Sequence, residues 1–290
     1  PRQFQQQGET ATLLPAKSSG DAGSWIQIEN IRTLLILMAY ATWEPRTDLL
    51  QEALGLQGLL VRYLREAGLT ESNTVLQRND HLQWQEWVEQ ESVRRTKLIA
   101  FTFVHMHSVA YNVYPVLRSS EIHLRLPCST AEWKASTASE WEAAQKGVDS
   151  QQLFFQDALT LLLQQPRATT VLNPIPAPLG NYILLHGLLQ RIHLVNELSL
   201  PNRDQFVSMP TEELNKVEYV YVMFYDYCLT SLLFSSLRQL SNFSRRALRS
   251  WTSVWQQAPE SSLDPHNENG PIPFTSSSLL SLAYVRLSLN

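Results

Sequence analysis

A stretch of about seven helical turns, running from Trp84 to Ser108, constrains the fold of this chain more than any other segment. Along it, aromatic, apolar and charged residues recur at alternating steps of three and four positions, which places them on one stripe of an α-helix. That stripe is half apolar and half charged, and it carries the motif Trp-x-x-Trp-x-x-x-Glu-Ser-x-Arg-Arg. Such a strip could serve catalysis, grip nucleic acid or brace the fold.

Helical periodicity also precedes this stretch. Apolar residues within 26–43 are spaced for a helix, and Pro45 ends it because the residue before a proline is pushed out of the α region. A second helix starts at Thr47 or Asp48 and ends near Gly68, which stands where a helix commonly has a left-handed residue. Two helices joined by so short a loop predict an antiparallel hairpin.

The rest of the chain predicts further helices and no convincing sheet. Residues 111–144 contain only short apolar runs, so we expect a mostly extended linker with two capped helical turns, starting at Ser129 and Thr137, each with a glutamate three positions later. Residues 217–227 alternate in part like a strand, but the helical spacing around them assigns them to a helix. Seven or eight helices are expected in all, the later ones at residues 152–163, 177–200, 211–240 and 243–259. The predicted fold class is all-α: a multi-helix bundle of antiparallel helical hairpins with a long extended linker in the middle.

The opening of the chain differs in composition from the remainder. Residues 1–24 are polar and rich in glycine, serine and glutamine, which predicts a disordered leader without a signal peptide. Residues 25–290 are then expected to form a single all-α domain. No later apolar run reaches about 18 residues, so membrane insertion is not expected.

Composition and charge exclude several classes of protein. Of the 290 residues, 44% are hydrophobic and 10% aromatic, which is ordinary for a globular core. The net charge of -4 and the pI near 6.0 argue against a surface that grips nucleic acid through its phosphates. Cys128 and Cys228 lack the spacing of a zinc site or a disulfide framework, so we expect both to be reduced thiols of an intracellular protein.

Histidines and tyrosines are the candidates for a ligand site. His105 and His107 are two residues apart, so on a helix they point to different faces, whereas metal pairs on a helix use a spacing of three or four. His186 and His193 share a face, yet no carboxylate accompanies them, so structural roles are favoured and no metal site is expected. If an apolar cavity binds a ligand, the residues expected to line it are His105, His186, His193, Tyr221 and Tyr225.

Patterns of catalytic residues are missing from the sequence. There is no GxSxG nucleophile motif and no glycine-rich phosphate loop, and aspartates that could hold magnesium are not clustered. We therefore assign no catalytic residue and favour a protein that is not an enzyme. The strip is interpreted instead as the spine of the fold, in which aromatic rings anchor the helix and charged side chains bind neighbouring helix ends. Its members are Trp84, Trp87, Glu91, Arg94 and Arg95.

Several separated motifs occur in order from about Ile28 to the C-terminus. They are WxxWxxxESxRRTKLIAFTF at 84–103, HSxAYN at 107–112, EIHLRLPCSTAEWKA at 121–135, PLGNYILLHGLLQRIHLV at 178–195, WxxxWQQAPESSLDP at 251–265 and NGPIPFTSSSLLSLAYVRL at 269–287. Together they resemble the regulatory domain of fungal-specific transcription factors, also called the middle homology region. The resemblance is greatest to the versions attached to two-Cys-two-His zinc fingers.

This resemblance implies an all-α regulatory region that lies C-terminal to a zinc-dependent DNA-binding module. In the wider superfamily an acidic residue follows the ExxRR-like motif within about three turns. Val104 and His105 occupy that neighbourhood here, which leaves Glu91 as the local partner of the arginines. Zinc-coordinating cysteines are missing from the chain, so zinc, and contact with DNA, are expected only through a module outside it. The chain stops where the resembling proteins continue with further helices, so the domain could be truncated or a naturally short relative.

Three functions are compatible with this resemblance. The favoured one is a nuclear regulatory domain that controls transcription by RNA polymerase II through ligand, partner or intramolecular contacts, with co-regulators or a small hydrophobic molecule as partners. The rival is a repurposed short relative in a secondary-metabolite pathway, acting as a small-molecule-binding protein or a cofactor-free cyclase or isomerase. Without a DNA-binding module its expected location is the cytoplasm. The third is a pure dimerisation scaffold, present as a homodimer.

Overall fold

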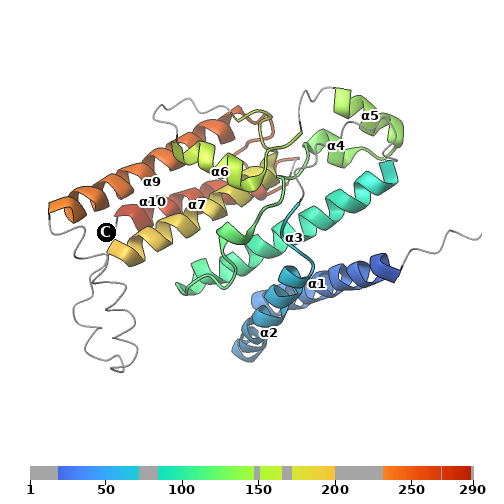
Figure 1. Ribbon diagram of the computed structural model, residues 1–290, viewed down its shortest axis with the longest axis horizontal. Coiled ribbons are helices and arrows are strands. Elements are labelled where there is room, and N and C mark those ends of the chain that lie inside the picture. Colours follow the sequence, from blue (N-terminus) through green and yellow to red (C-terminus); the bar gives the residue numbers. More distant parts are fainter. Residues whose placement is uncertain are drawn as a thin grey trace, which may run out of the picture. The chain divides into compact units, whose positions relative to one another are not determined.

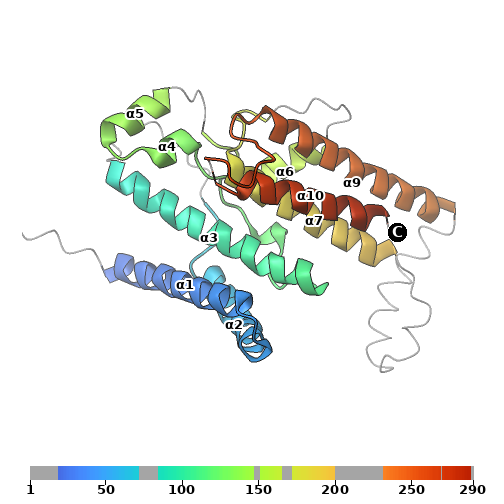
Figure 2. The ribbon, with the colours of Figure 1, turned by 180° about the vertical axis from the view of Figure 1, so that it is seen from behind.

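The computed structural model describes residues 19–71, 84–146, 151–164, 172–199, 231–268 and 270–288. Within these ranges the chain forms nine α-helices and one short 3-10 helix, and its extended segments pair only through isolated bridges (Figures 1 and 2). The all-α prediction is confirmed. Within the same ranges, no helix has the length and apolar character needed to cross a membrane.

The chain divides into two compact units, Pro1–Ala67 and Gly68–Asn290, which are described separately. The single domain expected over residues 25–290 stays a prediction. Residues 1–18 of the expected leader lie outside the described residues, and residues 19–24, also assigned to the leader, belong to the first helix.

The first unit contains a helical hairpin. α1 (Ser19–Trp43) and α2 (Thr47–Glu66) are joined by three residues that include Pro45, and the two helices pack against each other. Gly68, two residues after α2, has a φ of 75°, the left-handed conformation predicted for the end of this helix. The predicted hairpin is confirmed. Its buried apolar side chains are Ile28, Ile31, Leu34, Met38, Ala53, Leu60, Val61 and Leu64.

The central helix of the second unit is α7 (Pro178–Ser199). It packs against α3 (Trp84–Tyr111), α6 (Phe155–Gln164), α9 (Ser231–Gln257) and α10 (Ile272–Ser288). Its sequence is apolar on most sides, as expected for a helix surrounded by other helices. The buried apolar residues are Ile183, Leu184, Leu185, Leu188, Leu189 and Ile192.

Close approach of α6 to α7 requires a glycine. A Cβ added at Gly187 would lie 2.7 Å from a ring carbon of Phe155, which is fully buried and packs edge-on against Phe101 of α3. Glycine at this position therefore lets the Phe155 ring lie between α3 and α7.

The C-terminal helices differ from the prediction in two ways. α9 is continuous from Ser231 to Gln257, where the sequence predicted one helix ending at residue 240 and another starting at residue 243. α10 was not predicted. The part of the expected helix 211–240 that precedes residue 231, including the strand-like residues 217–227, lies outside the described residues.

The linker between α3 and α6 is mostly extended with short helical turns, as predicted. It contains a 3-10 helix (Ser119–Glu121), α4 (Thr130–Lys134) and α5 (Ala138–Lys146). At α4 the expected capping box is complete, because the Ser129 hydroxyl accepts from the Glu132 N–H at 3.2 Å and the Glu132 carboxylate accepts from the Ser129 N–H at 2.9 Å.

Extended residues 122–126 of the linker lie between two other segments. Thr70 and His123 form a parallel bridge, and Arg125 and Phe154 form an antiparallel one. The His123 N–H donates to the Leu69 carbonyl at 2.8 Å, and the Glu71 N–H donates to the His123 carbonyl at 3.0 Å. These bonds fix the segment that enters the second unit, and with it the Glu71 side chain.

Candidate functional site

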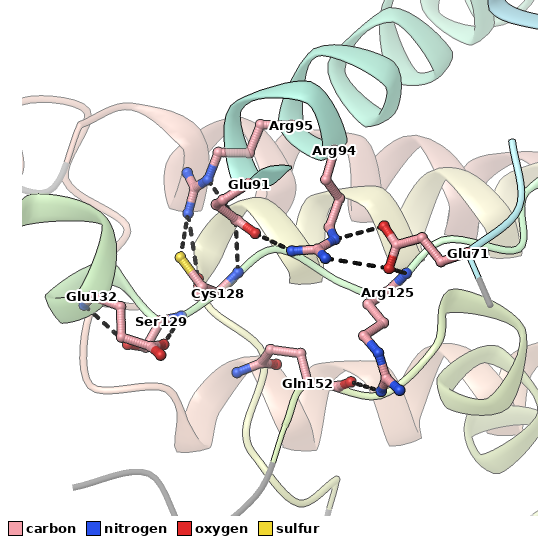
Figure 3. A network of polar contacts seen from close by, with 9 residues as sticks. All are labelled: Glu71, Glu91, Arg94, Arg95, Arg125, Cys128, Ser129, Glu132 and Gln152. Atoms are coloured by element: carbon pink, nitrogen blue, oxygen red, sulfur yellow. Dashed lines mark hydrogen bonds and ion pairs between the residues drawn. The ribbon is translucent and has the colours of Figure 1, made fainter. Parts of the chain in front are cut away.

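Glu91 is the centre of a buried polar network on α3 (Figure 3). Its side chain is fully buried, and its carboxylate accepts hydrogen bonds from Arg94 Nη1, from Arg95 Nε at 2.9 Å and from the Cys128 N–H at 2.9 Å. Arg94 and Arg95 follow Glu91 by three and four residues, so the helical repeat brings all three to one face. Cys128 is 37 residues further along the chain, and Glu91 thereby ties α3 to the linker.

Arg94 binds a second carboxylate from outside α3. Its Nε and Nη2 donate to the two oxygens of Glu71 at 2.8 Å and 3.2 Å, a two-pronged contact with good directional fit. Burial acts to lower the pKa of Arg94, but the ion pairs with Glu71 and Glu91 outweigh it, and the pKa is raised. Arg94 is therefore a permanent cation held between two anions. Lys97 adds a bond from Nζ to the Gly68 carbonyl at 2.7 Å.

Arg95 bridges the linker on the other side of Glu91. Its guanidinium carbon lies 4.0 Å from the centre of the Trp133 ring of α4, and its Nη2 donates to the Cys128 carbonyl at 3.3 Å. Arg95 also contacts the Cys128 sulfur at 3.5 Å. Burial and the nearby Glu91 charge raise the pKa of the Cys128 thiol above its usual range, so this cysteine is a neutral thiol and not a nucleophile.

The two tryptophans of the motif lie at the start of α3. The Trp87 ring packs on Trp141 of α5 with 5.2 Å between ring centres. Trp84 is half-buried, and among the described residues its indole N–H has no hydrogen-bond partner. α5 is thus attached to α3 chiefly through one pair of aromatic rings, since Trp141 is its only buried residue.

The histidines expected to line a ligand site lie in the core. His105 of α3 and His186 of α7 are buried, and their Nδ1 atoms are 2.7 Å apart, so one ring donates a hydrogen bond to the other. Burial lowers the pKa of His105 to about 3, with Arg286 and His193 adding to the effect, and lowers the pKa of His186 well below its usual value, with His105 adding to it. Both rings are neutral at pH 7. The Tyr182 ring packs edge-on against His186 at 4.5 Å.

Of the other members of that expected set, only His193 lies within the described residues. His193 is half-buried and its ring lies 6.2 Å from that of the exposed Tyr114. Tyr221 and Tyr225 lie outside the described residues. A ligand-binding role for these five residues stays a prediction. In the part of the chain that the structure describes, no group of three histidine, cysteine, aspartate or glutamate side chains is arranged to hold a metal ion.

Sequence patterns did not identify three contributors to the network. Glu71 follows a helix end by five residues, Arg125 lies in the linker, and the Cys128 contact uses a backbone N–H. Arg125 donates from its backbone to Glu71 at 3.5 Å and from Nη1 to the Gln152 carbonyl at 3.0 Å, and it stacks on Phe154. Partial apolar alternation in residues 122–126 was the only available signal that this segment is extended and could meet others.

The network can hold segments together, and its groups are poorly suited to bind an anion or transfer a proton. Both guanidinium groups of the motif are occupied by carboxylate or carbonyl oxygens, and only 18% of Arg94 and 13% of Arg95 is exposed. The charges of Arg94 and Arg95 are offset by Glu71 and Glu91. Geometry therefore favours internal bracing over catalysis or phosphate binding.

A family model described as the fungal specific transcription factor domain matches residues 7–253. Transcription factor PfmaH of Pestalotiopsis fici is 25% identical over 126 residues, covering 39% of this chain and 12% of that protein. Two zinc finger proteins of Schizosaccharomyces pombe also match: klf1 is 26% identical over 105 residues, and zas1 is 25% identical over 128 residues.

These matches cover part of each protein. The klf1 match covers 36% of this chain, and the zas1 match 43%. The chain spans only 12% to 13% of the length of the three relatives. No solved structure matches the chain. The family model, in contrast, covers most of the sequence, including the motif on α3, the linker and α7. The chain therefore belongs to the fungal specific transcription factor domain family.

Proposed function

We propose that this chain is the regulatory part of a nuclear transcription factor and acts on RNA polymerase II transcription through contacts with a partner, a ligand or another part of the same protein. The observation that carries the proposal is the family match over residues 7–253. Relatives named as a transcription factor and as zinc finger proteins support it.

DNA would be contacted by a separate zinc-dependent module outside this chain. Two observations support this division of labour. The arginines of the α3 motif are held by Glu71 and Glu91, so they offer little charge to a phosphate backbone. The whole chain also carries a net charge of -4. The zinc ion would then belong to the DNA-binding module alone.

Bracing by the network would matter for regulation because it fixes the linker to α3. α4 and α5 carry few buried residues of their own, and they are held through Cys128, Trp133 and Trp141. The exposed side chains of these short helices would be held in a single arrangement as long as Glu91 binds its three donors, and would lose that arrangement otherwise. Regulatory output should accordingly depend on Glu91 even though Glu91 itself is buried.

A tethering assay tests the proposal. The 290-residue chain is fused to a DNA-binding domain from another protein, and a reporter transcribed by RNA polymerase II is measured against that DNA-binding domain alone. We expect the fusion to change reporter output. Glu91→Gln should reduce this change at matched protein level. Glu86→Gln, at an exposed position on the same helix, should leave it in place. Output equal to that of the DNA-binding domain alone would refute a regulatory role for this chain.

The comparisons give no support to the rival function as a small-molecule-binding protein, cyclase or isomerase. Two of the residues on which it depends, Tyr221 and Tyr225, lie outside the described residues, and the buried histidine pair is explained by packing between α3 and α7. We therefore propose no second function.

A further inference from the structure

Residues 68–71, which we call the entry segment, pair with the linker. The His123 N–H donates to the Leu69 carbonyl at 2.8 Å, and the Glu71 N–H donates to the His123 carbonyl at 3.0 Å. These two bonds make the parallel bridge between Thr70 and His123. The backbone of the entry segment is therefore one of the supports that keep the linker extended at this position.

The same segment is bonded to α3. The two carboxylate oxygens of Glu71 accept from Arg94 Nε and Nη2, and Lys97 Nζ donates to the Gly68 carbonyl at 2.7 Å (Figure 3). Glu71 also accepts from the Arg125 N–H of the linker at 3.5 Å. Since only 25% of the Glu71 side chain is exposed, little water competes for its carboxylate. The entry segment thus joins α3 to the linker.

Arg94 takes part in two supports of the linker. The first is the entry segment, paired at His123, and the second is Glu91, which accepts from the Cys128 N–H at 2.9 Å. Because Arg94 binds both Glu71 and Glu91, release of Glu71 leaves its charge with Glu91 as its remaining carboxylate partner. One guanidinium therefore connects the position of the entry segment with the position of Cys128.

The entry segment is also the covalent continuation of α2. That helix ends at Glu66, and Ala67, whose N–H still donates to the Tyr63 carbonyl at 2.8 Å, is the one residue between α2 and Gly68. Gly68 has a φ of 75°, a conformation that glycine adopts at little cost. A displacement of the end of α2 therefore acts directly on the bonds of the entry segment.

We propose that the entry segment is a conformational switch for the linker. When the segment is bound, Arg94 has both of its carboxylates and the linker is fixed from His123 to Cys128. When it is released, the paired backbone and the shared guanidinium contact are lost together, and residues 122–134 become free to move. The regulatory consequence rests on the function proposed above, because this linker carries α4 and α5.

Hydrogen exchange of the full 290-residue chain, followed by mass spectrometry, tests the switch without a transcription assay. Glu71→Gln removes the charge that binds Arg94 and should speed exchange over residues 122–134 by about tenfold or more, while exchange in α9 and α10 stays unchanged. Glu66→Gln is the matched control, because the Glu66 carboxylate pairs with Arg62 on the exposed side of α2, and the linker should exchange as in the wild type.

A milder variant tests the same segment from its other end. Lys97→Met removes the bond to the Gly68 carbonyl and keeps both carboxylates of the network. It should speed exchange over residues 122–134 in the same way but to a smaller extent. Unchanged exchange in both Lys97→Met and Glu71→Gln would overturn the proposal.

A crosslink distinguishes release of the segment from loss of a charge alone. Thr70→Cys and His123→Cys place two thiols at exposed, bridged positions, where a disulfide can form. In a chain that also carries Glu71→Gln, oxidation should restore slow exchange over residues 122–134, and reduction should remove the rescue. Exchange that stays fast after oxidation would overturn the switch. So would an equal rise in α9 and α10, since the linker would then not be released by itself.

Reporter output separates this proposal from the transcriptional one. In the tethered fusion, Glu71→Gln should reduce the change in output at matched protein level, as Glu91→Gln does. A wild-type fusion without output would refute the proposed function, whereas faster linker exchange in Glu71→Gln would still support the switch. Full output from Glu71→Gln, in spite of faster linker exchange, would refute the regulatory role of the switch.

Discussion

Replacing Glu91 by glutamine removes one negative charge from a fully buried position and keeps the shape of the side chain. The new amide has one oxygen for the three donors that Glu91 now binds, and its NH2 group must face a guanidinium that also only donates. Arg94 keeps its second carboxylate, Glu71, and Arg95 keeps the Cys128 carbonyl.

The size of the effect follows from these remaining contacts. Removing one partner of a buried ion pair costs about 3–5 kcal/mol, because the other charge is left without compensation in a poorly solvated site. Since Arg94 and Arg95 each retain one partner, we expect Glu91→Gln to reduce the free energy of unfolding by about 3 kcal/mol, the lower end of this range. That is a large part of the stability of a typical domain, about 5–15 kcal/mol. It corresponds to a fall in Tm of about 6–12 °C for a domain of this size.

Urea and thermal unfolding of the full chain, followed by circular dichroism, measure this change. Glu86→Gln serves as the matched control, because Glu86 lies on the same helix but is exposed, and its free energy of unfolding should change by less than about 0.5 kcal/mol. If Glu91→Gln also changes the free energy of unfolding by less than about 1 kcal/mol, attraction within the network only balances its desolvation cost. The bracing role of Glu91 would then be wrong.

Three further predictions concern the core. Burial lowers the pKa of His105 to about 3 and that of His186 well below its usual value, so below about pH 6.5 the unfolded chain binds protons that the folded chain does not. Urea titrations should therefore show full stability above about pH 6.5. Below that pH, the free energy of unfolding should fall by up to about 1.4 kcal/mol per pH unit for each histidine. Gly187→Ala should destabilise the chain by about 1–3 kcal/mol, because the new Cβ meets a buried phenylalanine ring. In the same assay Gly58→Ala, in open space on α2, should stabilise the chain by about 0.5–1 kcal/mol. Burial raises the pKa of the Cys128 thiol above its usual range, so alkylation mapped by peptide mass spectrometry should modify Cys128 only as fast as the chain unfolds.

Helices with strongly periodic apolar residues could be predicted from the sequence, and α10 could not. α3 and α7 carry large apolar residues at three- and four-residue steps, which is the pattern of a buried helical face. The buried positions of α10 include Ser276 and Ala283, and serine is common in its first turns. Serine has a modest helix propensity, so this helix depends on packing against α7 and α9, which a local pattern does not reveal.

For the polar network, the sequence indicated the local pair and missed the partners from other segments. Glu91 and Arg95 are four residues apart, and that spacing alone predicts their contact on a helix. Glu71 lies 23 residues from Arg94, and the Cys128 N–H lies 37 residues from Glu91. Those contacts exist because residues 122–126 bring extended segments alongside α3, an arrangement set by tertiary packing and not by any repeat.

The contact between the two buried histidines could not be predicted from local spacing either. Helical spacing places His186 and His193 on one face of α7, yet the residue that meets His186 is His105, 81 positions earlier on another helix. His105 and His107 were expected to point to different faces of a helix, and both are buried because α3 is covered on more than one side.

One of the three donors to Glu91 is a backbone N–H, so the positions of the network differ in how they respond to mutation. Every amino acid except proline carries a main-chain N–H, so exchanges at Cys128 leave that donor in place, and none of them can supply a missing acceptor at position 91. A defect caused by losing Glu91 would be relieved only by removing the charges it leaves stranded. Selection for second-site suppressors of Glu91→Gln should therefore return uncharged residues at Arg95, whose remaining acceptor is a neutral carbonyl, and not at Arg94, whose loss would leave Glu71 without its guanidinium partner.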